Sequence, residues 1–99
     1  MKVRWTVPAA EQLEKAYHYI FESNPVAAER ITNHIVDVTE MLGKHPGAGR
    51  RGRLPGTREF AVPDTPFVVA YSVSKETVWI LAVYHGARKW PERARYGSR

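Results

Sequence analysis

The chain has 99 residues, of which 43% are hydrophobic and 25% charged, and it contains no cysteine. This length fits one domain with a modest core, and the composition is that of a globular rather than a disordered protein. The missing cysteine excludes disulfides, thiolate chemistry and Cys-based zinc sites. We find no signal peptide and no run of about 18–20 apolar residues, so we expect a single cytoplasmic domain over residues 1–99 with no membrane partner.

Positive charge is concentrated in the second half of the chain. Residues 1–43 hold four basic and six acidic side chains, a net charge of −2, whereas residues 44–99 hold eleven basic and four acidic ones, a net charge of +7. This segregation favours a polyanion or an acidic protein as the partner of the second half. The alternative is that the charge only keeps a small protein soluble.

The first half of the chain predicts a strand followed by two helices. Polar and apolar residues alternate over 2–7, as in a half-buried strand, and apolar residues spaced by three and four over 9–23 predict an amphipathic helix. Asn24 suits the N-cap of a second helix, Pro25 its first position and Gly43 its end. The short joint predicts an antiparallel helical hairpin.

The second half predicts a loop and then three strands. Residues 43–57 include five glycines and two prolines, which indicates a loop. Strands are predicted over 57–62, 66–73 and 77–84, and the last is so apolar that we place it in the interior of the sheet. The order of elements predicts an α+β fold, in which the N-terminal strand and the helical hairpin pack on a mostly antiparallel four-stranded sheet.

Several pieces of the sequence occur together, in this order, in one known family. They include Asn-Pro at 24–25, Gly-Thr-Arg-Glu-Phe at 56–60, Val-Val-Ala-Tyr at 68–71 and His-Gly-Ala-Arg-Lys-Trp-Pro at 85–91. With this set the chain resembles the RelE/ParE toxins, also known as plasmid stabilisation proteins, over nearly its whole length. The phrases at 56–60 and 85–91 are similar to those of the ParE branch.

The resemblance implies the toxin of a type II toxin–antitoxin system, which causes growth arrest and forms a hetero-oligomer with a cognate acidic antitoxin. ParE toxins inhibit DNA gyrase and so block replication, and this implies DNA gyrase as the target here. RelE toxins are ribosome-dependent endoribonucleases that cut mRNA, which is the first alternative. A basic nucleic-acid-binding module is the second, although no recognition helix or aromatic RNA-binding motif is present.

Cleavage of the RelE type needs a group that acts on the ribose 2′-OH, cations that stabilise the phosphorane and an acid for the leaving oxygen. The candidate catalytic residues are Arg58, His85 and Arg88. Where RelE members carry an arginine on the second C-terminal strand, this chain has Val68. The set of residues needed for cleavage of the RelE type is therefore incomplete, which favours the ParE interpretation. Whether the protein is an enzyme stays open at this point.

The histidine at position 85 has two interpretations. An imidazole titrates near neutral pH and would serve as a general acid or base. Alternatively, His85 ends a strand and hydrogen-bonds a loop carbonyl, which would fix the turn into Gly86. The histidines at 18, 34 and 45 have no metal-ligand spacing, so no metal site is expected. No cofactor is expected either, and the lack of a Walker motif argues against nucleotide binding.

Cations of the loop and of the C-terminal tail are candidates for contacts with a partner. Arginine binds carboxylates and phosphates bidentately, and Trp90 would add an aromatic anchor. We expect the antitoxin to lay acidic side chains across residues 50–58 and 85–95, whereas the alternative is a solvated loop. The candidate partner-binding residues are Arg50, Arg51, Arg53, Arg58, Arg88, Lys89 and Trp90.

Overall fold

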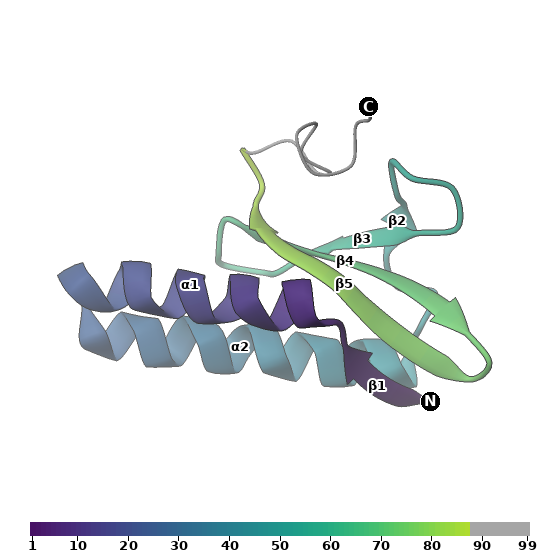
Figure 1. Cartoon of the computed structure of the whole chain (residues 1–99), viewed down its shortest axis with the longest axis horizontal. Helices are drawn as coiled ribbons and strands as arrows, with labels where there is room; N and C mark the ends of the chain where they lie inside the picture. The colour runs from purple at the N-terminus through teal and green to yellow at the C-terminus, as the bar shows by residue number, and fades with distance from the viewer. Residues whose placement is uncertain (88–99) are drawn as a thin grey trace.

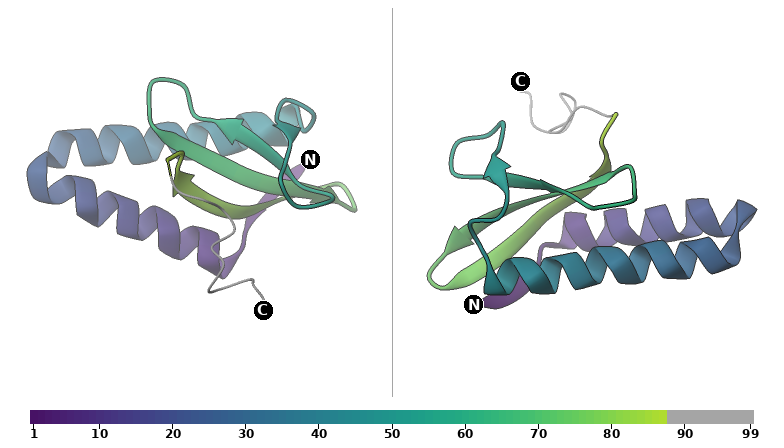
Figure 2. Two further views of the ribbon diagram at one scale, coloured as in Figure 1. Left: turned by 90° about the horizontal axis from the view of Figure 1, so that it is seen from above. Right: turned by 180° about the vertical axis from the view of Figure 1, so that it is seen from behind.

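The computed structural model describes residues 1–87 and shows two layers, a helical hairpin and a sheet (Figure 1). The α+β class predicted from the sequence is confirmed. The hairpin lies under one face of the sheet and extends past it at the joint between the helices (Figure 2). The elements are β1 (Lys2–Trp5), α1 (Val7–Ser23), α2 (Pro25–Lys44), β2 (Arg50–Arg51), β3 (Arg58–Ala61), β4 (Phe67–Ser74) and β5 (Thr77–His85).

One residue both ends α1 and begins α2. The backbone N–H of Asn24 donates to Ile20 O at 2.8 Å, and its side-chain Oδ1 accepts from Ala27 N at 3.0 Å. Pro25 occupies the first position of α2, where its missing N–H costs nothing. The predicted N-cap is confirmed, and it explains why the two helices are joined by a single residue.

Gly43 does not close α2, as the sequence predicted, but lies inside it. The helix continues to Lys44, and His45 N–H donates to Met41 O at 2.9 Å at the C-cap. A Cβ at Gly43 would lie only 2.7 Å from Val3 Cγ2. The glycine therefore allows β1 to cross close above α2, where the N-terminal ammonium group of Met1 donates to Gly43 O at 3.0 Å.

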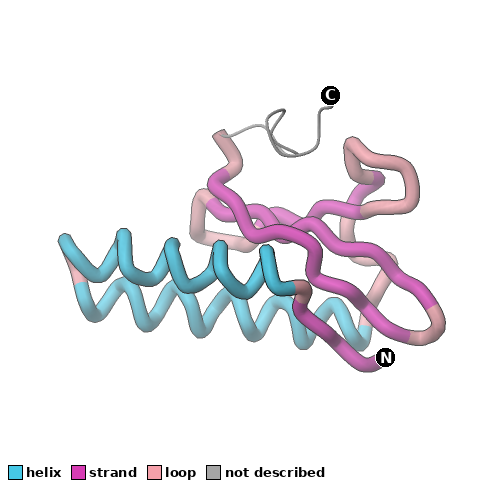
Figure 3. The backbone as a smooth tube through the Cα atoms, viewed as in Figure 1, coloured by secondary structure: helices cyan, strands magenta, loops and turns pink. Residues whose placement is uncertain are grey.

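The sheet has the strand order β1-β5-β4-β3-β2, with β1 parallel to β5 and the other pairs antiparallel. Figure 3 shows the strands in magenta and the helical hairpin in cyan. The predicted interior position of the apolar strand β5 is confirmed. The sheet has five strands rather than four, because Arg50–Arg51 pairs with Arg58 and Glu59 inside the segment predicted as loop. Two arginines have no apolar alternation, so no periodic signal marked this strand.

A bulge in β5 sets which side chains reach the helices. Ala70 pairs with Ala82 and Tyr71 with Ile80, which leaves Leu81 as the extra residue. Ile80 and Val83 can therefore both enter the core beneath the sheet although they are three positions apart. The bulge is held by α1, since Gln12 Oε1 accepts from Val83 N at 2.8 Å.

Two apolar clusters lie on opposite faces of the sheet. The larger one, between sheet and helices, has Ile35, Leu42 and Tyr71 among its fully buried side chains. The smaller one consists of Val68, Ala70, Ala82 and Tyr84, with Leu54 and Leu81 packed against it. We call the sheet surface that carries this second cluster the open face. Within residues 1–87, no helix has a stretch both long and apolar enough to cross a lipid bilayer.

The turn between β4 and β5 offers a test of the local backbone. Lys75 and Glu76 have φ values of 51° and 61°, and the flanking Ser74 and Thr77 pair directly. Such a two-residue hairpin turn favours Asn-Gly, whereas a left-handed conformation costs other residues about 1–2 kcal/mol each. We expect the double substitution K75N/E76G to raise the free energy of unfolding by about 1–2 kcal/mol in urea titrations. An unchanged or lowered value would contradict the left-handed turn.

Candidate protein-binding site on the open face

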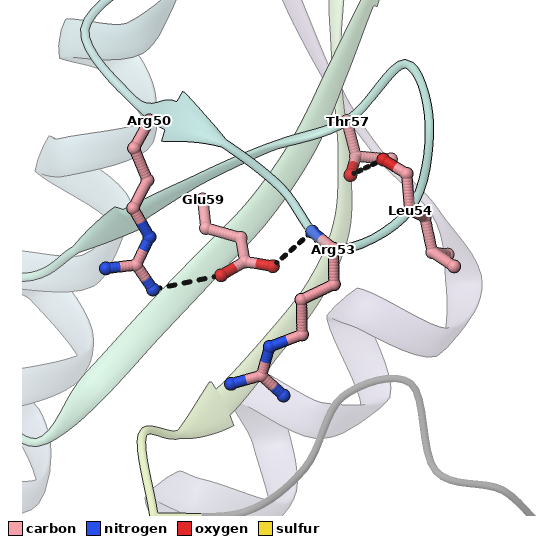
Figure 4. Close-up of polar contacts among 5 residues, drawn as sticks. All are labelled: Arg50, Arg53, Leu54, Thr57 and Glu59. Atoms are coloured by element: carbon pink, nitrogen blue, oxygen red, sulfur yellow. Dashed lines mark hydrogen bonds and ion pairs between the residues drawn. The ribbon is translucent and has the colours of Figure 1, made fainter.

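A buried carboxylate organises the edge of the open face. Glu59 lies in β3, its side chain is 2% exposed, and its neighbour Phe60 packs on the opposite, helix-facing side. Oε1 accepts from Arg50 Nη2 at 3.1 Å, and Oε2 accepts from the backbone N of Arg53 at 3.0 Å (Figure 4). A buried carboxylate needs such partners, because an unpaired one is expensive to desolvate.

The segment between β2 and β3 is folded into a closed loop above the second cluster. Gly52 N–H donates to Thr57 O at 2.8 Å, and Thr57 Oγ1 donates to Leu54 O at 2.6 Å. Leu54 rests on the second cluster. A Cβ at Gly52 would collide with Thr57 Oγ1, so this closure requires glycine. Glu59 thus ties this loop to the sheet through the backbone N–H of Arg53.

Electrostatics in this site favour an ionised Glu59. Burial alone raises the pKa of the Glu59 carboxyl, but the Arg53 N–H bond, the Arg50 hydrogen bond and the positive charges of both arginines outweigh it, so the pKa lies below its usual value. Burial and the charge of Glu59 both raise the pKa of the Tyr84 hydroxyl, against the opposing effect of the arginines. The four side chains form one coupled group.

The structure divides the predicted loop arginines between two faces. Arg50 pairs with Glu59 in the β2–β3 ladder, and the backbone N–H of Arg53 donates to the Glu59 carboxylate. Arg51 pairs with Arg58, and alternation along the strands puts both on the other side of the sheet. There Arg58 Nη1 donates to Gly49 O at 2.7 Å and supports the loop after α2.

The candidate catalytic residues are not assembled into one site among the described residues. Arg58 pairs with Tyr71 and His85 with Phe67, four positions apart on β4, which separates them by roughly 13 Å along the strand. His85 Nδ1 accepts from Ala87 N at 3.1 Å, so it fixes the turn through an N–H and not through a carbonyl. Three further candidates, Arg88, Lys89 and Trp90, lie outside the described residues.

The position at which a nuclease of this fold would carry arginine is closed and apolar. Val68 belongs to the second cluster and is 9% exposed. It lies beside Ala70 and Ala82, which are fully buried. No three His, Asp or Glu side chains within residues 1–87 approach one another closely enough to hold a metal ion.

Glu59 was missed as a site residue by the sequence reasoning, which concentrated on cations. A signal was nevertheless present, because Glu59 is the only acidic residue between Glu40 and Asp64 and follows four arginines. A lone acid among arginines on an otherwise apolar strand is a candidate for a buried ion pair. Its burial depends on the pairing of β2 with β3, which the sequence did not predict.

Solved structures first define the class of fold. The isolated RelE toxin of E. coli superimposes with a TM-score of 0.56 over 90% of this chain and 87% of its own, at 14% sequence identity. This likeness shows the fold alone. A chain of the chromosomal ParDE TA system from P. aeruginosa is more similar, with a TM-score of 0.76 and 30% identity over 86% of this chain and 95% of its own.

Sequence comparison then gives the family. The model of the ParE toxin of the type II toxin–antitoxin system parDE matches residues 3–90. The "Putative toxin Y4kP" of Sinorhizobium fredii is 35% identical over 92% of this chain and 94% of its own length. Toxin RelE2 of Caulobacter vibrioides is 30% identical over 88% of this chain and 97% of its own. The chain belongs to the ParE toxin family and is a toxin of the type II toxin–antitoxin class.

Proposed function

We propose that the protein arrests bacterial growth by inhibiting DNA gyrase, without an active site of its own, and that a cognate antitoxin neutralises it in the cytoplasm. The observation that carries this proposal is the second cluster. RelE members carry an arginine at the position of Val68, where this chain has a buried valine between other apolar side chains. The similarity to a ParDE chain, at a TM-score of 0.76, supports the same branch.

The candidate catalytic side chains make structural hydrogen bonds, which also supports a toxin that acts by binding its target. Arg58 donates a hydrogen bond to Gly49 O, and His85 accepts one from Ala87 N in the turn that follows it. General acid–base catalysis needs its groups within hydrogen-bond reach of one reacting centre. Arg58 lies beside Tyr71 and His85 beside Phe67, four residues apart on β4. The two side chains are therefore too far apart to act on one reacting centre.

Expression in bacteria distinguishes the two targets. We expect induction of the protein to cause DNA-damage signalling and filamentation before protein synthesis falls, because poisoned gyrase interrupts replication. Co-expression of the adjacent antitoxin gene, expected upstream as a small acidic reading frame, should restore growth. Transcripts cut at codons while replication continues would instead establish the ribonuclease alternative.

The antitoxin contact is proposed from the charge of the second half of the chain. Acidic side chains of the antitoxin would lie across residues 50–58 and 85–95, and the first of these segments carries four arginines. Hydrogen exchange of the purified complex should show protection in both segments relative to the free toxin. Protection confined to the helical hairpin would contradict this contact.

A further inference from the structure

We propose that Arg50, positioned by Glu59, binds a carboxylate of an acidic peptide segment whose apolar side chains pack on Leu54 and Leu81. This inference rests on the antitoxin part of the proposed function, because an antitoxin segment would be such a peptide, and it is independent of gyrase. It separates the loop arginines by role. Arg50 binds the partner, whereas Arg51 and Arg58, on the other side of the sheet, do not.

The geometry of Arg50 leaves it ready for a second carboxylate. Its side chain is 69% exposed, and within residues 1–87 its one hydrogen bond runs from Nη2 to Glu59 Oε1. Among residues 1–87, the other N–H groups of this guanidinium have no protein partner. Because Glu59 fixes one edge of the planar group, the opposite edge is already oriented toward solvent, and less side-chain entropy is lost on binding.

The local charge is complementary to one added carboxylate. Two guanidinium groups, those of Arg50 and Arg53, act on the Glu59 carboxylate. These three side chains together carry a net charge of +1, and the surrounding segment, residues 44–58, contains no acidic residue. A carboxylate from a partner would balance the site.

The apolar neighbours favour a peptide over a nucleic acid. Leu54 and Leu81 are half-buried and lie against the second cluster on the open face. The aromatic residue of the second cluster, Tyr84, is 8% exposed and presents no ring face on which a base would stack. Strands β2 and β5 are three strand spacings apart, roughly 14 Å, which an extended segment of four or five residues spans.

The test uses the full-length protein and three probes of defined chemistry. The first probe is a twelve-residue peptide of alternating Glu and Leu, the second has Ser in place of Leu, and the third is a single-stranded oligonucleotide of equal charge. Binding is measured by isothermal titration at physiological salt. We expect the Glu–Leu peptide to bind most tightly, since it alone offers both carboxylates and apolar side chains.

A pair of neighbouring substitutions separates a specific contact from general charge. R50Q and R51Q each remove one exposed positive charge from β2, on opposite faces of the sheet. We expect R50Q to weaken binding of the Glu–Leu peptide about tenfold, as the loss of a charge-assisted hydrogen bond does, and R51Q to weaken it less than about threefold. Equal weakening by both variants would overturn the proposal.

Two further variants guard against misfolding and test the apolar contact. R50K keeps a counter-ion for Glu59 but lacks the planar fork, so it should stay folded and still bind several-fold more weakly than the wild type. L54S should weaken binding of the Glu–Leu peptide and leave binding of the Glu–Ser peptide unchanged. Tighter binding of the Glu–Ser peptide or of the oligonucleotide than of the Glu–Leu peptide would also overturn the proposal. Since gyrase is absent from this assay, its outcome is separate from that of gyrase inhibition.

Discussion

Substituting phenylalanine for Tyr71 should lower the free energy of unfolding by about 2–3 kcal/mol. Tyr71 is fully buried, and its hydroxyl accepts from Gly49 N at 2.8 Å and donates to Pro46 O at 2.8 Å. These two bonds hold the segment that leads from α2 into β2. Phenylalanine fills the same space, so the decrease in unfolding free energy measures the cost of leaving Gly49 N–H and Pro46 O without their partner.

The matched control is Y19F, which removes the same hydroxyl from a side chain that is 79% exposed. We expect its unfolding free energy to stay within about 0.5 kcal/mol of the wild type in urea titrations. If Y71F were as stable as Y19F, the anchoring of the loop by Tyr71 would be wrong. The position of Arg50 on the open face should also change in Y71F, because the segment that Tyr71 holds leads directly into Arg50.

The substitution E59Q should cost about 2 kcal/mol at neutral pH and progressively less in acid. Glutamine keeps the shape of Glu59 but loses the ion pair with Arg50 and weakens the bond from Arg53 N–H. In the folded protein, the pKa of the wild-type carboxyl lies below the ordinary glutamate value of 4.5. A lowered folded pKa stabilises the fold above the unfolded pKa, and this contribution disappears as the pH falls through the folded pKa.

The difference in unfolding free energy between wild type and E59Q is therefore expected to be constant from neutral pH down to about pH 5, and to shrink at lower pH. Urea titrations across this range measure it. E40Q serves as the control, because Glu40 is exposed on α2 and its side chain has no hydrogen bond or ion pair among the described residues. A difference that grew in acid would mean that the folded pKa of Glu59 is raised and that burial dominates.

Local signals in the sequence were enough to predict most of the fold. Asn24 and Pro25 marked the joint of the hairpin, and the apolar run of β5 marked an interior strand, because capping and burial leave direct traces in residue types. Gly43 was misassigned because glycine is common both at helix ends and at close crossings. Only the distance to Val3 in the folded chain distinguishes the two cases.

The site was less predictable than the fold because it depends on register. Arg50 and Arg51 are adjacent in sequence and equivalent in chemistry, yet the pairing of β2 with β3 sends them to opposite faces. Glu59 is buried only because that pairing brings Arg50 and Arg53 to it. Val68 was the exception, since an apolar residue at an expected cation position can be recognised without knowing the register.

A supercoiling assay with purified bacterial gyrase, relaxed plasmid and ATP tests the proposed gyrase inhibition most directly. If the protein is a gyrase toxin, it should reduce the formation of supercoiled plasmid in proportion to its concentration, and addition of the cognate antitoxin should restore it. Undiminished supercoiling at saturating protein, together with cleavage of mRNA in a purified translation system, would contradict the proposal and establish a ribonuclease.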